Sequence, residues 1–558
     1  MTSIAGTSQW EELVTSALLG TDRRTPPDAV LTPRKDPPVA LLDAAAVHTV
    51  RRRAGLLPAP AAARPEPAPH DARPQLPAPA RRRLAQLLAD RSAPSHAGGR
   101  RGTAPDLTEL LPQWLAAANE HGYQAPPTVL PALLDAARAR TDLRPQALTF
   151  AGPRGLWLAR LNPEWKFALR GTSWGSPRTE SGGSSVLPDA GDAEAVQRLW
   201  EEGLFAERVA LLAAVRVRDA GAALALLTAT WATERAEDRL MFLDSLRTGL
   251  SDADEPFLEQ ALSDRSRNVR ATAAELLSAL PHSALARRMA ARAASCVSLD
   301  RSGDGDAAIG VEAPHECDAG MQRDGVAPSP PSGRGERSWW LGQLVEAAPL
   351  STWPGRLGGR TAQEIVALPV ADGWGEELHA AWCRAAVRQR DAEWSRALLG
   401  APGNPPETGP GTSSLAERAK LLATLPDGER AVWVAKFIAA HGLSEAFQLL
   451  GVCAVPWGEP LGRSVVDALD IAREAGSYPW SFSGVMGLAE RCLDPAEAGR
   501  LELLTATPDE TEGAAPGAGG YWSEAFQRLV STLRLRAAMR VELGGVTSPT
   551  PPLPETED

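Results

Sequence analysis

Three arginines recur at a constant interval in the middle of the chain. The same interval separates Arg208 from Arg239 and Arg239 from Arg270, and we call it one period of the repeat. The positions three, four and seven residues after each arginine are apolar or small, as on the buried face of an amphipathic helix. These positions hold Leu211, Leu212 and Val215, then Phe242, Leu243 and Leu246, then Ala273, Ala274 and Leu277.

A second apolar segment follows each of these helices, after a short run of turn residues. The second helices are expected at Ala222–Trp231, Pro256–Ala261 and Ser283–Ala294. A helix pair repeated every ~30–47 residues is typical of α-solenoids, because one pair cannot bury its apolar face alone. We therefore predict an all-α fold, an α-solenoid of stacked helical pairs. The alternative is a non-repeating bundle whose Leu- and Ala-rich helices fall into register by chance.

The third copy of the repeat has a recognisable pattern. It reads LSDRSRNVRATAAELLSAL, with an Asp–Arg turn, then Val269 and Arg270, then alternating alanines and leucines. This segment resembles a HEAT repeat, which implies that the predicted helical pairs are HEAT-like.

Composition divides the rest of the chain. Spaced prolines exclude a helix and favour an extended connector, whereas a stretch rich in Gly, Pro, Ser and Asp favours disorder. We predict an N-terminal helical region (1–150) with a Pro-rich linker (56–80), HEAT-like repeats (151–296), a disordered insertion (297–336), a C-terminal helical-repeat domain (337–543) and a disordered tail (544–558).

Local patterns predict helices through both ends of the chain. The first is expected at residues 8–19, with Ser8 as its N-cap, Glu11 as the capping-box partner and Gly20 as its end. The C-terminal third is predicted as antiparallel helices at Thr361–Leu368, Glu376–Gln389, Ala392–Leu399, Leu415–Leu425, Asp427–His441, Ser444–Leu450, Leu461–Ala475, Ser481–Cys492, Pro495–Thr505 and Ser523–Leu543.

The charge balance argues against nucleic acid as a partner. The net charge is −11, whereas phosphate binding favours a basic surplus. Arginine triplets do occur at Arg51–Arg53 and Arg81–Arg83, and residues 1–150 carry 18 Lys and Arg against 14 Asp and Glu. We interpret these triplets as solvated helix ends beside a linker.

Cysteine usage and hydropathy indicate the compartment. The five cysteines form no CxxC pair, which fits a reducing environment. No apolar run reaches the ~18 residues that a membrane span needs, and the N-terminus lacks a signal-peptide pattern. We expect a cytoplasmic protein that does not contact membranes.

The common catalytic signatures are absent from the sequence. It holds no P-loop, no strand–GxGxxG–helix unit, no GxSxG and no HExxH. His315–Cys317 and the pair His379 and Cys383 offer too few ligands for a zinc site, and a packed histidine and a core cysteine are the simpler interpretation. We therefore nominate no catalytic, cofactor-binding or metal-binding residue, expect no cofactor, and leave the partner-binding residues open.

Tryptophan is unusually frequent, with 17 residues against three tyrosines. Large aromatic side chains wedge between packed helices, which is our preferred interpretation. A groove of exposed tryptophans would instead hold a partner peptide. Many occur once per predicted helix: Trp10, Trp114, Trp200, Trp231, Trp382, Trp394, Trp433 and Trp522.

Three segments carry a family resemblance: WEELVTSALLGTDRRTPP (Trp10–Pro27), GLWLARLNPEWKF (Gly155–Phe167) and ELHAAWCRAAVRQRDAEWSRALL (Glu377–Leu399). Together they resemble an uncharacterised, mainly actinobacterial family defined as a domain of unknown function. The resemblance implies no catalytic residues. It implies genes encoded near a MoxR-type AAA ATPase, a von Willebrand factor A-domain protein and a SWIM zinc-finger protein.

Three functional hypotheses follow. The first is a non-enzymatic scaffold or adaptor that binds a protein partner, such as the AAA ATPase or the von Willebrand factor A-domain protein. The arginines of the repeat would then either contact the partner or hold neighbouring repeats together. The second is an enzyme with an unrecognised all-α active site, for which a deep pocket with clustered histidines and carboxylates near His379 would be evidence. The third is a nucleic-acid binder that uses the Arg-rich N-terminal region, which the acidity of the chain makes the weakest.

Overall fold

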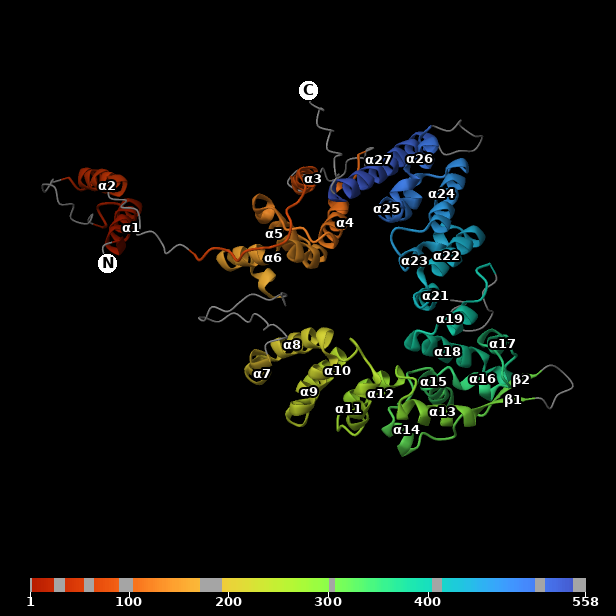
Figure 1. Cartoon of the computed structure of the whole chain (residues 1–558). Helices are drawn as coiled ribbons and strands as arrows, with labels where there is room; N and C mark the ends of the chain where they lie inside the picture. Colours follow the sequence, from red (N-terminus) through yellow and green to blue (C-terminus); the bar gives the residue numbers. More distant parts are fainter. Residues whose placement is uncertain are drawn as a thin grey trace, which may run out of the picture. The chain divides into compact units, whose positions relative to one another are not determined.

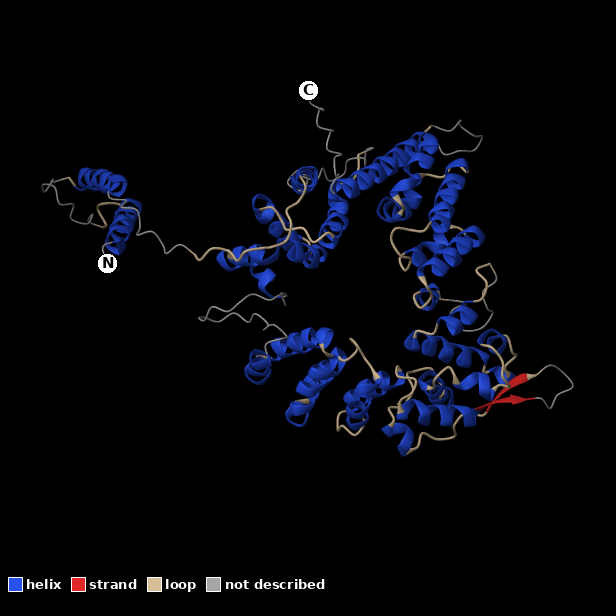
Figure 2. Ribbon diagram, in the orientation of Figure 1, coloured by secondary structure: helices blue, strands red, loops and turns tan. Residues whose placement is uncertain are grey.

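The computed structural model describes residues 3–24, 36–54, 65–89, 104–170, 193–300, 307–403, 414–506 and 517–544. In these ranges the chain is helical almost throughout, which confirms the all-α prediction apart from one short hairpin of strands (Figures 1 and 2). The chain separates into two compact units, Met1–Ala68 and Pro69–Asp558. No helix of the described residues is long and apolar enough to cross a membrane.

The first unit is a pair of helices, α1 (Ser3–Leu19) and α2 (Pro37–Ala54), which pack on each other. Leu13 and Ala44 are buried. The prediction that Ser8 caps the first helix is wrong, because α1 already begins at Ser3. Gly20 does end the helix: its φ of 88° is left-handed, where glycine avoids the steric cost of a side chain.

The second unit begins with residues 69–77, which run extended before a group of helices. Of the linker predicted at 56–80, residues 65–77 are not helical, residues 78–80 are already helical, and residues 56–64 lie outside the described part. The segment is more than a linker, however, since Asp71 and Leu76 are buried. The helices that follow are α3 (Ala78–Ala89), α4 (Leu107–Glu120), η2 (Pro127–Val129), α5 (Leu130–Ala139), η3 (Thr141–Leu143), α6 (Arg144–Leu161) and η4 (Pro163–Arg170), where η denotes a short 3₁₀ helix.

A salt bridge fixes this segment to a break in α6. Arg73 pairs with Asp71 at 2.7 Å and donates hydrogen bonds to the carbonyl oxygens of Thr149 and Phe150. The hydrogen bond from Arg73 lowers the pKa of Asp71. The helix breaks at Gly152 (φ 57°), where a Cβ atom would lie 2.0 Å from the Arg73 guanidinium. The predicted domain boundary at residue 150 is therefore wrong, because it falls inside α6, which this contact stabilises.

The N-terminal part of the second unit packs against the last helix of the chain, α27 (Ala518–Gly544). Met539 and Leu543 of α27 belong to the hydrophobic core formed by α3 to α6. The Tyr123 hydroxyl donates to the Leu543 carbonyl at 2.8 Å, and Gln113 donates to the Arg491 carbonyl at 2.7 Å. Nothing in the local sequence of either segment predicts this long-range packing.

The repeat region consists of helices at the predicted places. Each of the second helices exists, and all nine positions of the predicted apolar stripe are buried except the half-buried Ala274. The helix α8 packs on α9 and α10, and α10 packs in turn on α12. The elements are α7 (Ala193–Glu202), α8 (Phe205–Arg218), α9 (Ala220–Thr230), η5 (Trp231–Thr233), α10 (Ala236–Ser245), η6 (Asp252–Asp254), α11 (Glu255–Ala261), α12 (Arg267–Ser278) and α13 (Ala284–Cys296).

One salt bridge is buried between consecutive copies of the repeat. Arg216, at the end of α8, forms two hydrogen bonds with Asp254 at 2.8 and 2.6 Å, and both side chains are almost fully buried. The same guanidinium donates to four backbone carbonyls, of which Leu246, Thr248 and Gly249 belong to the turn after α10. A buried charge needs this degree of pairing to offset its loss of hydration.

The prediction of a disordered insertion at 297–336 is wrong for the residues that the structure describes there, 297–300 and 307–336. Strands β1 (Val297–Asp300) and β2 (Ala308–Val311) pair antiparallel, with Val297 opposite Val311. The helix α14 (Ala319–Arg323) follows, and its Met321 is buried.

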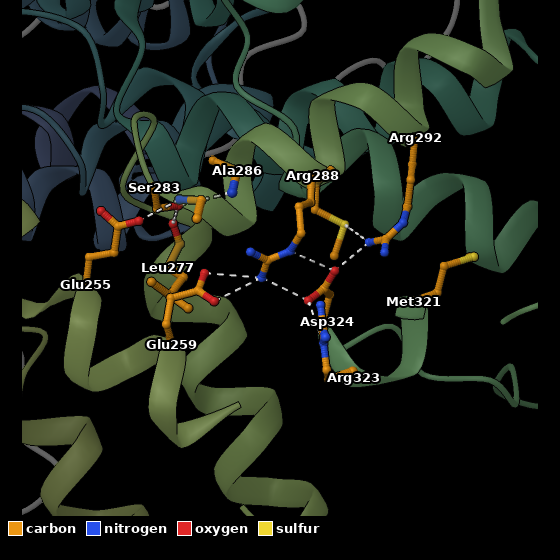
Figure 3. A network of polar contacts seen from close by, with 12 residues as sticks. Glu255, Glu259, Leu277, Ser283, Ala286, Arg288, Arg292, Met321, Arg323 and Asp324 are labelled. Carbon is orange, nitrogen blue, oxygen red and sulfur yellow. Dashed lines mark hydrogen bonds and ion pairs between the residues drawn. The ribbon is translucent and has the colours of Figure 1, made fainter. Parts of the chain in front are cut away.

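A charge network explains why this segment is ordered despite its composition (Figure 3). The Asp324 side chain is fully buried and accepts hydrogen bonds from Arg288 and Arg292 of α13 at 2.7–3.0 Å. Arg288 also pairs with Glu259 of α11 at 3.1 Å. Burial alone would raise the pKa of Asp324, but the hydrogen bonds from the two arginines outweigh it and lower that pKa. Composition could not predict this, since the partners lie 32–36 residues earlier in the chain.

The C-terminal part confirms the predicted helices, with Asp427–His441 and Ala392–Leu399 matching at both ends. The segment Pro495–Thr505, which was predicted as one helix, instead consists of short turns of 3₁₀ and α-helix. The tail is outside the described residues after Gly544. The elements are α15 (Glu336–Ala347), α16 (Thr352–Arg356), α17 (Ala362–Val366), η7 (Ala371–Gly373), α18 (Gly375–Gln389), α19 (Ala392–Leu399), α21 (Leu415–Leu422), α22 (Asp427–His441), α23 (Leu443–Leu450), α24 (Glu459–Glu474), η8 (Pro479–Phe482), α25 (Ser483–Cys492), η9 (Pro495–Glu497), α26 (Ala498–Leu501) and η10 (Glu502–Thr505).

Candidate functional site: an aromatic pocket beside helix α27

A pocket of about 290 Å³ lies between α27 on one side and η8 with α25 on the other. The wall from α27 is built by residues spaced three, four and seven positions apart, which places them on one helix face. These residues are Tyr521, Glu524, Ala525 and Arg528, and the opposite wall consists of Pro479, Trp480, Ser483 and Met486. We call this site the aromatic pocket.

Three aromatic rings form a cluster at this pocket. Tyr478 stacks on Trp480 with ring centroids 4.0 Å apart and an interplanar angle of 15°. Tyr521 meets the same indole edge-on, at 5.3 Å and 66°. Two of the three tyrosines of the chain therefore surround one tryptophan. Such rings are rigid, amphipathic and common at the centre of protein interfaces.

Trp480 differs from the other tryptophans in its exposure. It is 55% exposed, and it is the only tryptophan among the described residues that is exposed rather than buried or half-buried. Met486 and Ala525, which also line the pocket, are buried. Leaving a large indole in water forgoes the ~2–3 kcal/mol that burial of a large apolar side chain contributes, so an occupant that covers it would gain this energy.

The pocket is lined by two charged side chains, Arg528 and Glu524. Arg528 pairs through Nε with the Glu490 carboxylate at 2.7 Å, and both side chains are only 14% exposed. The second carboxylate, Glu524, is exposed and lies one helical turn before Arg528. Glu490 does not belong to the lining, so the lining itself holds one carboxylate, Glu524, and one guanidinium, Arg528.

The arginines of the repeat have structural contacts. Arg208 forms an ion pair with Glu234 and lies over the rings of Trp200 and Phe242, 4.5 and 5.2 Å from their centroids. Burial alone would raise the pKa of Glu234, but hydrogen bonds that include one from Arg208 lower it. These contacts join α7, α8 and α10, so Arg208 is occupied within the fold.

Arg239 repeats the arrangement one period later. It pairs with Asp264 at 2.6 Å and lies 5.6 Å from the centroid of Trp231. Trp200 and Trp231 are also one period apart, so a Trp–Arg pair recurs with the repeat. Arg270 departs from it, because Leu262 takes the place of the tryptophan and the guanidinium donates to the backbone carbonyls of Asp264 and Arg265.

The tryptophans named from the sequence serve packing. Of these eight, seven are buried: Trp114, Trp200, Trp231, Trp382, Trp394, Trp433 and Trp522. Trp10 is half-buried. The sequence missed Trp480 because a tryptophan of the core and one of a pocket share the same local pattern. The nearby tyrosines were the available signal, since tyrosine is rare in this chain.

The histidines and cysteines considered for metal binding lie apart from the pocket. His379 and Cys383 are buried on α18, where His379 contacts the Trp382 ring at 5.6 Å. His315 is largely exposed, 3.8 Å from Glu312. The described residues contain no group of three or more His, Cys, Asp or Glu placed to hold a metal ion.

The Arg81–Arg83 triplet is partly used in packing. Arg83 pairs with Glu542 of α27 at 2.8 Å, and Arg81 donates to the Leu76 carbonyl at 3.4 Å. Arg82 is exposed. Of the other triplet, the side chains of Arg51 and Arg52 are outside the described part.

Comparison with known proteins gives a family but no described function. A model of a family of unknown function, DUF5691, matches residues 12–543. No curated protein and no solved structure matches the chain. The match spans nearly the whole sequence, including the repeat region and both walls of the aromatic pocket. The chain therefore belongs to the DUF5691 family of proteins of unknown function.

Proposed function

We propose that the protein is a non-enzymatic adaptor, an α-solenoid of HEAT-like helix pairs that binds a protein partner. The observation that carries the proposal is the recurring Trp–Arg pair. Trp200 with Arg208, and Trp231 with Arg239, connect neighbouring helices by the same kind of contact one period apart. Helical-repeat proteins built in this way bind partners along the extended surface of their stacked helices.

The long-range packing of the second unit supports the same proposal. Repeat arrays need terminal elements that cover their last apolar face. Here α3 and α4 pack against α27, and Met539 and Leu543 are buried between them. The N-terminal part of the unit thus acts as the cap of its C-terminal end. The aromatic pocket lies beside α27, the helix that this packing holds in place.

Two candidate partners come from the family resemblance, namely the MoxR-type AAA ATPase and the von Willebrand factor A-domain protein. A cytoplasmic location belongs to the proposal, since none of the five cysteines forms a disulfide and reducing compartments keep cysteines in the thiol state. Burial raises the pKa of the Cys453 thiol to about 11, which suits a packing role better than a reactive one.

Affinity purification of the tagged full chain from its native host, followed by quantitative mass spectrometry, tests the proposal. We expect one or a few proteins to be enriched, and the purified partner to form a complex of defined stoichiometry with the purified chain in analytical ultracentrifugation. Failure of every enriched protein to form such a complex would contradict the adaptor function.

A further inference from the structure

We propose that the aromatic pocket binds the proline-rich tail of the same chain, residues 545–558, as a polyproline II helix. Polyproline II is the extended left-handed helix that proline favours, with about three residues per turn. The two PxxP motifs of the tail, Pro549–Pro552 and Pro551–Pro554, would lie against Trp480. The inference does not depend on the adaptor function, because it concerns a contact of the chain with itself.

The lining of the pocket suits an uncharged, rigid ligand. Proline-rich segments bind grooves lined by aromatic rings, because a polyproline II helix is already formed before binding and loses little entropy. Trp480 is 55% exposed and lines the pocket, and Tyr521 meets its ring edge-on at 5.3 Å. The two charged groups of the lining, Glu524 and Arg528, have opposite signs, so the lining favours neither an anion nor a cation.

The aromatic surface continues beyond the pocket. Phe447 of α23 is 43% exposed, and its ring lies 3.0 Å from the position that a Cβ atom of Gly484 would occupy. Gly484 directly follows Ser483, which lines the pocket on α25. A polyproline II helix rises about 9 Å per turn, so a segment of two turns is long enough to contact a ring outside the pocket as well.

The fold already contains a proline-rich segment that is held by tryptophans. Pro328–Pro331 has the PxxP pattern and is not helical. The indole N–H of Trp340 donates to the Pro328 carbonyl at 2.8 Å, and that of Trp339 donates to the preceding carbonyl at 2.9 Å. The indole of Trp480 would hold a carbonyl of the tail by the same kind of contact.

The tail is long enough to reach the pocket from the end of α27. A rise of about 1.5 Å per helical residue places Arg528 about 24 Å and Glu524 about 30 Å from Gly544. Residues in polyproline II rise about 3.1 Å each, which places Pro551 and Pro554 at about 22 and 31 Å from the same residue. The second PxxP motif therefore reaches the level of the pocket when the tail runs back alongside α27.

Fluorine NMR of the full chain labelled with 5-fluorotryptophan tests the contact. The resonance of Trp480 is assigned by its loss in Trp480→Phe. One variant, which we call the tail variant, replaces the four prolines of the two motifs: Pro549→Ser, Pro551→Ser, Pro552→Ser and Pro554→Ser. We expect the tail variant to shift the Trp480 resonance and to increase its H₂O/D₂O isotope shift, because the ring becomes more accessible to solvent. A matched control, Pro58→Ser with Pro60→Ser, alters another proline-rich stretch and should leave the resonance unchanged.

A synthetic peptide with the sequence of residues 546–558 measures the same contact by calorimetry. It should bind the tail variant about tenfold more tightly than the wild type, because the tethered tail competes at a high effective concentration. Its binding should return the Trp480 resonance of the tail variant to the wild-type position. Trp480→Ala in the tail variant should abolish binding, whereas Leu503→Ala, which removes a side chain that is 81% exposed, should not. Circular dichroism verifies that each variant is folded.

Several outcomes would overturn the inference. These are an unchanged Trp480 resonance in the tail variant, equal binding of the peptide to the tail variant and the wild type, or peptide binding that survives Trp480→Ala. A Trp480 resonance whose position depends on protein concentration would assign the pocket to the tail of a second copy and would overturn the inference as well. None of these results bears on the adaptor function, which depends on complex formation with a partner.

Discussion

Arg83 and Glu542 are 459 residues apart in the sequence and form a two-bonded ion pair, with Nε 3.1 Å from Oε2 and Nη2 2.8 Å from Oε1. This pair joins α3 to α27, and each of its two side chains is about one-fifth exposed. Because planar, two-bonded pairs of this kind are directional, they fix the relative position of the elements that they join.

Arg83→Glu should place two carboxylates against each other and destabilise the second unit by about 1–2 kcal/mol, more than an exposed ion pair contributes. The double variant Arg83→Glu with Glu542→Arg should recover most of the loss. Melting curves of the full chain measure both. If the double variant is no more stable than Arg83→Glu, the two side chains do not stabilise the unit by pairing with each other.

Arg216 and Arg247 give a matched comparison within the repeat, since they are one period apart. Arg216→Ala leaves the buried Asp254 carboxylate without its partner and should cost about 3–5 kcal/mol. Arg247→Ala should cost less than about 1 kcal/mol, because its pair with Glu275 is nearly half exposed on both sides. Urea denaturation measures the free energy of unfolding of both variants. Similar losses of stability would contradict the difference in burial between the two ion pairs.

Trp200 and Trp480 should respond differently to the same truncation. Trp200→Ala removes a fully buried ring beneath Arg208 and should destabilise the fold by about 3–5 kcal/mol. Trp480→Ala should change the melting temperature little, since the indole is 55% exposed. Differential scanning fluorimetry of both variants tests this contrast; a large loss of stability in Trp480→Ala would indicate a structural role instead.

The pH dependence of the segment around Asp324 follows from its lowered pKa. A carboxyl group with a lower pKa in the folded state stabilises the fold above its unfolded pKa of about 3.9. This contribution disappears as the pH falls through the folded pKa. Asp324→Asn should therefore cost about 2 kcal/mol at pH 7, and its difference from wild type should vanish well below pH 4.

Hydrogen exchange of residues 307–336 at a series of pH values measures this effect locally. Arg323 provides a control, because its side chain is mostly exposed and lies 3.7 Å from Asp324. Arg323→Gln should leave the protection of the segment nearly unchanged. A constant difference between wild type and Asp324→Asn from pH 7 to pH 3 would contradict the proposed pairing of the ionised carboxylate.

Much of the helical structure could be predicted from the sequence, because apolar periodicity is a local property. The helix at Asp427–His441 and the buried stripe after Arg208 are examples. The order of residues 307–336 could not, since it depends on Arg288 and Arg292 of another helix. The aromatic pocket could not be predicted either, because Trp480 and Tyr521 come together only through the packing of η8 on α27.

Removal of one period of the repeat tests the central claim most directly. Deletion of residues 208–238 places Arg239 where Arg208 stands in the natural chain, at the same separation from Trp200. A control deletion of residues 208–236 retains two more residues. It shifts the apolar stripe after the junction by two positions, which places the stripe on a different face of the helix. Thermal unfolding followed by circular dichroism compares the two. The α-solenoid predicts cooperative unfolding and native helicity for the one-period deletion but not for the control; loss of cooperative unfolding in both would contradict a repeating array.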